Sequence, residues 1–210
     1  MSHFDKKLRA TVLDFFRKHM VEGDCGRLQF TFRDGMGNTE TEYWSKDLHL
    51  VPTTDGIWLA YNGFPAQVRH LFISHSAADI LCFCHYNSNW LSAEGNIAFA
   101  SLGLVASFGQ LHFLSHFFSN AKVHTLFENG VVGRVSDCKA ALWLKNRDAT
   151  FRLDGQNIHI GYHKSKFVMT VQLFSLNHFE KVAGIRSGIR THKPKDGSNS
   201  FYNFFVDTNP

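Results

Sequence analysis

Two stretches of this chain, Leu71-Phe-Ile-Ser-His-Ser-Ala-Ala-Asp79 and Leu126-Phe-Glu-Asn-Gly-Val-Val-Gly-Arg134, decide the fold. Each begins as an apolar run, stops at small and acidic residues, and continues as a helix-like segment. In an open α/β sheet, ligands, metals and phosphates bind where the carboxyl ends of the strands meet. If both runs are strands of one sheet, Asp79 and Glu128 face the same crevice. The side chains of that crevice then decide which chemistry is available.

The middle of the chain predicts three strand–helix units in succession. The expected strands lie at 68–73, 96–101 and 122–127, and the expected helices at 77–86, 110–118 and 136–144. Three such units in a row imply a largely parallel sheet with helices across its faces. The predicted fold class is therefore α/β, with a mostly parallel sheet flanked by helices.

The two ends of the chain carry other patterns. Residues 3–20 repeat apolar side chains at helical spacing, and short β elements follow up to residue 61. We expect an N-terminal α+β appendage at 1–65, and a domain at 66–210 that includes a C-terminal extension. Within that extension, residues 167–184 are expected to form a helix.

Composition is that of a globular protein with a large core. The chain has 210 residues, of which 44% are apolar and 21 are phenylalanine, and its formal charge is +4. A mildly basic balance is compatible with a nucleic-acid partner. No apolar run is long enough to cross a membrane, and the N-terminus has no signal-peptide core. Its four cysteines have no CxxC spacing, so reduced thiols in a cytoplasmic protein are expected.

Residues 66–148 carry three landmarks in a recognisable order. His75 ends the first expected strand and Asp79 opens the helix that follows; Ser101-Leu102-Gly103 ends the second strand; Glu128-Asn-Gly130 ends the third, with Gly133-Arg134 close behind. This order resembles the Toprim domain, which bacterial primases, type IA and type II topoisomerases and some nucleases share. In that family the position of His75 holds a glutamate, and the positions of Glu128 and Gly130 hold two aspartates.

The resemblance implies phosphoryl transfer assisted by Mg²⁺, which carboxylates hold in place. It implies catalytic roles for His75 and Glu128, and metal binding by Asp79 and Glu128. An imidazole at position 75 can move protons near neutral pH, but it is a poor ligand for Mg²⁺. Gly130 supplies no ligand at all, so two of the three core acids are missing. The expected cofactor is therefore Mg²⁺ or none.

Simpler roles exist for the same residues. Asp79 suits the N-terminal turn of a helix, where the macrodipole favours a negative charge. His75 can form a local hydrogen bond. Gly130 and Gly133 suit turn geometry, and Arg134 is either a solvated charge or a phosphate contact.

A basic stretch near the C-terminus lies beside aromatic residues. Cations next to rings suit single-stranded nucleic acid, because charges follow the phosphates and rings stack on bases. A solvated basic face is the alternative. The residues expected to contact nucleic acid are Arg134, Arg186, Arg190, Lys193 and Lys195.

Three functions stay open. The first is a Toprim-like protein, similar to primase-like proteins of bacterial mobile elements, that binds nucleic acid (DNA) or a protein partner with weak or absent phosphoryl transfer. The second is an active Mg²⁺-dependent nuclease or primase-type enzyme with rearranged ligands. The third is a non-enzymatic interaction or scaffold protein that retains only the fold.

Overall fold

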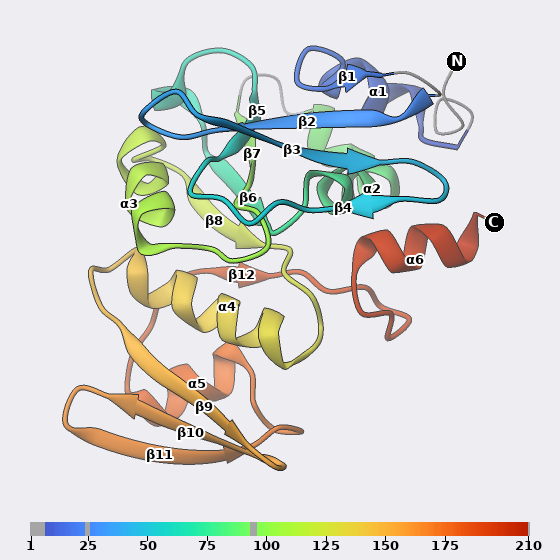
Figure 1. Cartoon of the computed structure of the whole chain (residues 1–210). Coiled ribbons are helices and arrows are strands. Elements are labelled where there is room, and N and C mark those ends of the chain that lie inside the picture. The colour runs from blue at the N-terminus through green and yellow to red at the C-terminus, as the bar shows by residue number, and fades with distance from the viewer. Residues whose placement is uncertain (1–6, 24–25, 93–95, 210) are drawn as a thin grey trace.

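The N-terminal region is a short helix followed by an antiparallel sheet (Figure 1). The structure, a computed structural model, describes residues 7–23, 26–92 and 96–209. The first elements are α1 (Ala10–Phe16), β1 (Val21–Glu22), β2 (Leu28–Arg33), β3 (Thr39–Trp44) and β4 (His49–Leu50), and the strand order is β1-β2-β3-β4. Asp34 closes the turn between β2 and β3 by accepting the backbone N–H of Asn38 at 2.8 Å. Alternate residues of β2 face the core, namely Leu28, Phe30 and Phe32.

A five-stranded sheet forms the centre of the molecule. Its strands, in the order β12-β8-β6-β7-β5, are β12 (Arg190–Thr191), β8 (Lys122–Thr125), β6 (His70–Ser74), β7 (Ile97–Ser101) and β5 (Trp58–Tyr61). β6 pairs in parallel with both β7 and β8, β8 pairs in parallel with β12, and β5 runs antiparallel to β7. The two strands that the opening motifs predict are therefore neighbours in one sheet.

Both faces of this sheet are covered, which explains why β6 and β7 read as continuous apolar runs. One face packs on α1, α2 (Ala77–Tyr86) and the N-terminal sheet, in a cluster that includes Phe16, Phe30 and Phe72. The other face packs on α3 (Phe108–Phe117) and α4 (Val131–Trp143), in a cluster that includes Leu71 and Leu111. The first cluster joins residues on both sides of position 65, and the domain boundary expected there stays a prediction.

The C-terminal region adds a small sheet and two helices. These elements are β9 (Ala149–Asp154), β10 (Asn157–Tyr162), β11 (Ser165–Thr170), α5 (Leu176–Ala183) and α6 (Phe201–Thr208). The three strands form an antiparallel sheet in the order β11-β10-β9. The helix expected at 167–184 is therefore wrong in its first part. Phe167 pairs with Ile160 and Met169 with Ile158, so this segment follows the period of a strand.

Parallel pairing is confined to the central sheet. The N-terminal and C-terminal sheets are antiparallel throughout, because tight turns connect their successive strands. The fold is thus mixed α/β, and the expectation of a mostly parallel sheet does not extend to the chain as a whole.

Two further expectations can be compared with the structure. No helix within the described ranges is both long enough and apolar enough to cross a membrane. Cys82, Cys84 and Cys138 are free and buried. Cys25 and the start of the helix expected at 3–20 lie outside the described residues.

Candidate functional site at the carboxyl edge of the central sheet

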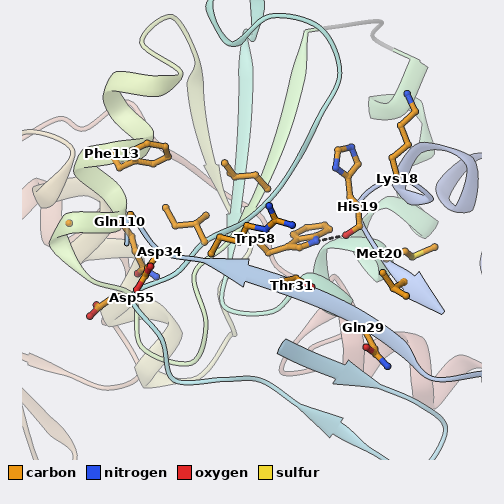
Figure 2. Close-up of a pocket in the computed structure, with 16 residues that line it drawn as sticks. Lys18, His19, Met20, Gln29, Thr31, Asp34, Asp55, Trp58, Gln110 and Phe113 are labelled. Carbon is orange, nitrogen blue, oxygen red and sulfur yellow. Dashed lines mark hydrogen bonds between the residues drawn. The ribbon is translucent and has the colours of Figure 1, made fainter. Parts of the chain in front are cut away.

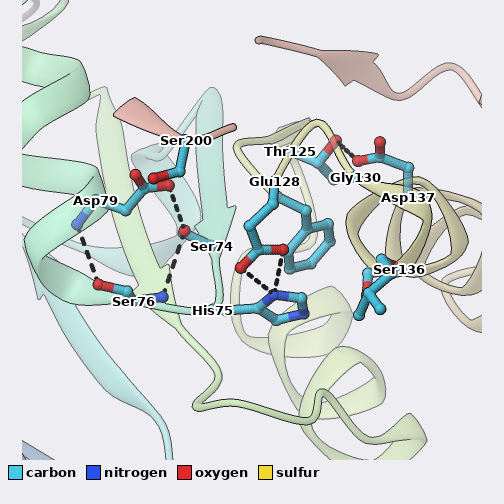
Figure 3. Close-up of polar contacts among 12 residues, drawn as sticks. Ser74, His75, Ser76, Asp79, Thr125, Glu128, Gly130, Ser136, Asp137 and Ser200 are labelled. Carbon is cyan, nitrogen blue, oxygen red and sulfur yellow. Dashed lines mark hydrogen bonds and ion pairs between the residues drawn. The ribbon is translucent and has the colours of Figure 1, made fainter. Parts of the chain in front are cut away.

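The carboxyl ends of β6 and β8 form a topological switch point. The two strands are adjacent and parallel, but α2 follows β6 on one face of the sheet and α4 follows β8 on the other. Open α/β sheets bind ligands at such points. His75 follows β6 directly and Glu128 lies shortly after β8, so the two residues come together at this edge (Figure 3).

The side chains of His75 and Glu128 contact each other directly at this edge. The His75 Nδ1 lies 2.9 Å from each carboxylate oxygen of Glu128, so this nitrogen carries the hydrogen that the carboxylate accepts. The His75 side chain is 4% exposed and that of Glu128 is 31% exposed. Burial raises the pKa of Glu128, but the hydrogen bond and charge of His75, together with Lys193, outweigh it and leave the pKa lowered. Glu128 is thus an ionised carboxylate with a fixed protein partner.

Asp79 points toward the C-terminal helix. Its carboxylate accepts the backbone N–H of Tyr202 at 2.6 Å and the hydroxyl of Ser74 at 3.3 Å. Tyr202 lies in the first turn of α6, so Asp79 stabilises the N-terminus of that helix. Burial raises the pKa of Asp79 to about 6, against the hydrogen bond from Tyr202. Asp79 lies in the first turn of α2, as its simpler role predicts, and its carboxylate also reaches the first turn of α6.

Glu42 is a buried residue at this edge that sequence reasoning missed. It lies on β3, is fully buried, and reaches the N-terminus of α2. Its carboxylate accepts hydrogen bonds from the Ser76 hydroxyl at 2.7 Å, the Ala77 N–H at 2.7 Å and the Ala78 N–H at 3.0 Å. A signal was present in the sequence: Glu42 and Trp44 are two residues apart in a strand, and therefore share one face. A carboxylate on the face that holds a buried tryptophan requires a polar partner.

Lys193, expected to contact nucleic acid, is bound inside the protein. Its ammonium lies 2.8 Å from the Asp137 carboxylate and donates to the carbonyls of Phe127 at 2.6 Å and Glu128 at 2.9 Å. An ammonium has three donors, and these contacts use all three. Asp137 also accepts the Thr125 hydroxyl at 2.6 Å. Burial raises the pKa of Asp137, and Lys193 opposes that rise.

The C-terminal segment also covers the position of the second missing acid. The Asn129 N–H donates to the Asn199 backbone carbonyl at 2.6 Å, and the Gly130 N–H donates to the Asn199 side chain at 3.1 Å. Gly130 precedes α4 as its N-cap residue, in extended backbone geometry. Gly130, which has no carboxylate to offer a metal ion, is thus held in place by the same C-terminal segment that supplies Lys193.

Gly133 and Arg134 explain how α4 approaches the edge so closely. A Cβ atom at position 133 would overlap the backbone of Glu128, so only glycine fits there. Arg134 donates to the Asn129 carbonyl at 2.8 Å and to the carbonyls of Val171 and Phe174 at 3.1 Å each. Arg134 therefore links α4 to the segment after β11. Of the five residues expected to contact nucleic acid, three are exposed without a side-chain partner in the described part of the chain: Arg186, Arg190 and Lys195.

The described residues of this edge do not form a ligand set for Mg²⁺. Within the described residues, no group of three or more His, Cys, Asp or Glu side chains is placed to hold a metal ion. Carboxylate oxygens of both Asp79 and Glu128 accept hydrogen bonds from protein donors. Mg²⁺ demands near-octahedral oxygen ligands, and these two residues do not fit that requirement as they lie.

A row of three histidines crosses the central sheet. His70 Nδ1 lies 3.0 Å from His124 Nε2, and His124 Nδ1 lies 2.9 Å from His192 Nε2. His124 is fully buried, and the ring of Phe72 stacks on it with centroids 4.4 Å apart. The row runs from the first residue of β6 to the residue next to Lys193, so it connects the two edges of the sheet.

A large cavity lies elsewhere, between the N-terminal sheet, β5 and α3 (Figure 2). Its volume is about 770 Å³ and none of the predicted site residues lines it. The Trp58 indole donates to the His19 carbonyl at 2.6 Å, and the Gln110 amide donates to the carbonyls of Gly56 at 2.7 Å and Leu102 at 2.8 Å. These contacts join the walls of the cavity.

Comparison with protein families and with curated proteins found no match. Among solved structures, the chain is similar to a chain of a bacteriophage T7 complex. That complex is described as the lagging-strand DNA polymerase interacting with primase domains of two gp4 subunits bound to an RNA/DNA hybrid and dTTP. The similarity covers 67% of this chain and 72% of that chain, at 14% identity and a TM-score of 0.43.

Proposed function

We propose that this chain binds nucleic acid and does not catalyse phosphoryl transfer at the carboxyl edge of its central sheet. The observation that supports this most directly is the pair of 2.9 Å contacts from His75 Nδ1 to Glu128. Glu128 is the one carboxylate that the Toprim resemblance retains at a core position. Its partner is an imidazole, where a Toprim enzyme would bind a metal ion.

Phosphoryl transfer requires positive charge that is free to meet the negative charge of the transferring group. At this edge, His75 is bound to Glu128 and Lys193 is bound to Asp137. The remaining acid, Asp79, serves the N-terminus of α6. Among the described residues of this edge, His75 and Lys193 are therefore both bound to protein carboxylates, and the carboxylates of Asp79 and Glu128 both accept hydrogen bonds from the protein.

Nucleic-acid binding is supported by charge on other surfaces. The formal charge is +4, and Arg186, Arg190 and Lys195 are exposed. Neutralising phosphates releases counterions, so such binding weakens steeply as salt rises. In this proposal the chain is a Toprim-like protein whose catalytic edge serves the fold, and DNA is the expected partner.

Binding and catalysis can be tested together. Fluorescence anisotropy with labelled single-stranded and duplex DNA is expected to show an association constant that falls linearly with salt on logarithmic axes. Incubation with Mg²⁺ or Mn²⁺ is expected to give neither cleavage nor primer synthesis. A product that depends on a divalent metal and that Glu128→Gln abolishes would favour the alternative of an active Mg²⁺-dependent nuclease or primase-type enzyme. Absence of salt-dependent binding would favour the alternative of a non-enzymatic interaction or scaffold protein.

A further inference from the structure

The amino edge of the central sheet, opposite the crevice, gathers four cations. Lys122 is the first residue of β8, and its backbone N–H donates to the carbonyl of Arg69 at 2.8 Å. Arg190 lies on β12, in register with His124 of β8. Lys145 and Lys122 line the same cavity. We call Arg69, Lys122, Lys145 and Arg190 the amino-edge cluster.

The amino-edge cluster has no internal partners. All four side chains are exposed, and none makes an ion pair or side-chain hydrogen bond with any described residue. Lys193, in contrast, uses all its donors inside the protein. An unpaired, hydrated cation can exchange its counterion for a phosphate at little cost.

Two of the cations act on the neighbouring histidine row. The pKa of His70 is lowered by burial first, and then by the positive charges of Lys122 and Arg190. The pKa of His124 is lowered to about 3 by burial, by its two histidine neighbours and by the same two cations. Lys122 and Arg190 thus contribute to the lowered pKa values of both His70 and His124.

A small cavity beside Lys122 adds neutral donors to the charge. It has a volume of about 380 Å³ and lies between the start of β8, the end of α3 and the loop after α5. Its polar lining consists of Lys122, Lys145, Ser115, Ser119 and Ser187. The two ammonium groups and the hydroxyls of Ser119 and Ser187 can donate to phosphate oxygens, whereas the Ser115 hydroxyl already donates to the His112 carbonyl at 2.7 Å. No carboxylate is among the described residues that line the cavity.

The geometry points to the amino-edge cluster and its cavity as the surface that binds the phosphates of a nucleic-acid strand. This inference rests on the proposed function and gives it a location, on the edge of the sheet opposite the predicted catalytic residues. Arg190 is then the one residue that the sequence-based prediction and the amino-edge cluster share.

The C-terminal sheet provides a matched control surface. Arg152, Lys164 and Lys166 are exposed there, as Arg190, Lys145 and Lys122 are at the amino edge. On that sheet a carboxylate is close by, since Asp154 lies 3.9 Å from Arg152. Each set contains one arginine and two lysines, with two residues in strands and one in a turn.

The experiment compares Lys122→Ser/Lys145→Ser/Arg190→Ser with Arg152→Ser/Lys164→Ser/Lys166→Ser. Both variants lose the same charge, and both are first shown to keep the wild-type melting temperature. The probe is fluorescein-labelled oligothymidylate, titrated at several salt concentrations. We expect the amino-edge variant to bind roughly tenfold more weakly, with a salt slope smaller by about 2, since each phosphate contact on a single strand contributes about 0.7. The control variant is expected to bind like the wild type.

Other outcomes separate this inference from the proposed function. Equal weakening of both variants, or weakening of the control alone, would overturn the amino-edge surface and leave nucleic-acid binding intact. No binding by the wild type would overturn both. Equal binding of labelled polyglutamate, lost in the amino-edge variant, would replace the nucleic acid with an acidic protein partner. Competition by inorganic phosphate at equal molar concentration would mean that a free anion, and no strand, is the ligand.

Discussion

The two edges of the central sheet use charge in opposite ways. At the carboxyl edge four described acids have partners inside the protein: His75 for Glu128, Lys193 for Asp137, and helix N-termini for Asp79 and Glu42. At the amino edge, the amino-edge cluster has no partner among the described residues. Buried charges are costly unless paired, whereas exposed charges are stable without partners. The edge with the recognisable motifs thus has internal partners for its charges, and the opposite edge is the one where we propose that a ligand binds.

Replacing Glu42 is expected to have the largest effect on stability. Glu42→Ala leaves the Ser76 hydroxyl and the first N–H groups of α2 buried without their acceptor. We expect the free energy of unfolding to fall by about 4 kcal/mol, as for a broken buried charge network. Urea denaturation followed by circular dichroism measures it.

The control for Glu42 lies on the same strand. Glu40→Ala removes the same carboxylate from an exposed position, and the expected loss is about 0.5 kcal/mol or less. If both variants lost the same free energy of unfolding, the buried contacts of Glu42 at the carboxyl edge would not stabilise the fold more than an exposed carboxylate does.

Replacing Lys193 tests the same edge from its cationic side. Lys193→Met leaves Asp137, whose side chain is 3% exposed, without its ion-pair partner. We expect a loss of about 3 kcal/mol in the free energy of unfolding. Lys195→Met, two residues away and exposed, is expected to change stability by about 0.5 kcal/mol or less. A Lys193→Met variant with wild-type stability but impaired DNA binding would mean that Lys193 contacts DNA and does not stabilise the fold.

The histidine row predicts a smaller, pH-dependent effect. His124 has a pKa of about 3 in the folded protein against 6.5 in its ordinary state, so the unfolded chain takes up the proton first. The stability that depends on a neutral His124 is therefore present above pH 6.5 and is lost as the pH falls toward 3. Because one pKa unit corresponds to about 1.4 kcal/mol, the expected loss is at most about 1.4 kcal/mol per pH unit across this window.

The measurement is the difference in unfolding free energy between the wild type and His124→Gln. That difference is expected to shrink as the pH falls from 6.5 to 4. A constant difference for His124→Gln would mean that His124 is not held neutral.

Asp79 is expected to have a pH dependence of the opposite sign. Its pKa is raised to about 6, so its contribution to stability falls as the pH rises from 3.8 to about 6. Asp79→Asn should therefore gain stability relative to the wild type over that interval.

The parts of this fold that the sequence predicted are those with local causes. α2 was expected at 77–86 and is found at Ala77–Tyr86, because Ser76 caps its N-terminus by accepting the Asp79 N–H at 3.1 Å. The adjacency of β6 and β8 has no such local cause, because α2, β7 and α3 lie between these two strands in the chain. β11 was missed because the apolar residues that follow it resemble one face of a helix, and only pairing with β10 reveals the strand.

The candidate site was predictable in position but not in its bonding. The sequence brought His75 and Glu128 to one crevice, yet their direct contact depends on side-chain geometry. The partners of Ala77 and Asp137, namely Glu42 and Lys193, come from segments far along the chain. No local pattern distinguishes Lys193 from Lys195, although the first is bound inside the protein and the second is exposed. Tertiary packing makes that distinction.

The histidine row has a further consequence for proton movement. A neutral imidazole carries one N–H, so two N···N hydrogen bonds in series allow only two tautomeric arrangements of the three rings. In one, the outer hydrogen is on His70 Nε2; in the other, it is on His192 Nδ1. A proton that arrives at one end releases a different proton at the other, while every heavy atom stays in place. The row therefore has two tautomeric states, whose outer hydrogen lies at one or the other of two partly exposed ends, and the nitrogen-15 chemical shifts of the three rings would change together.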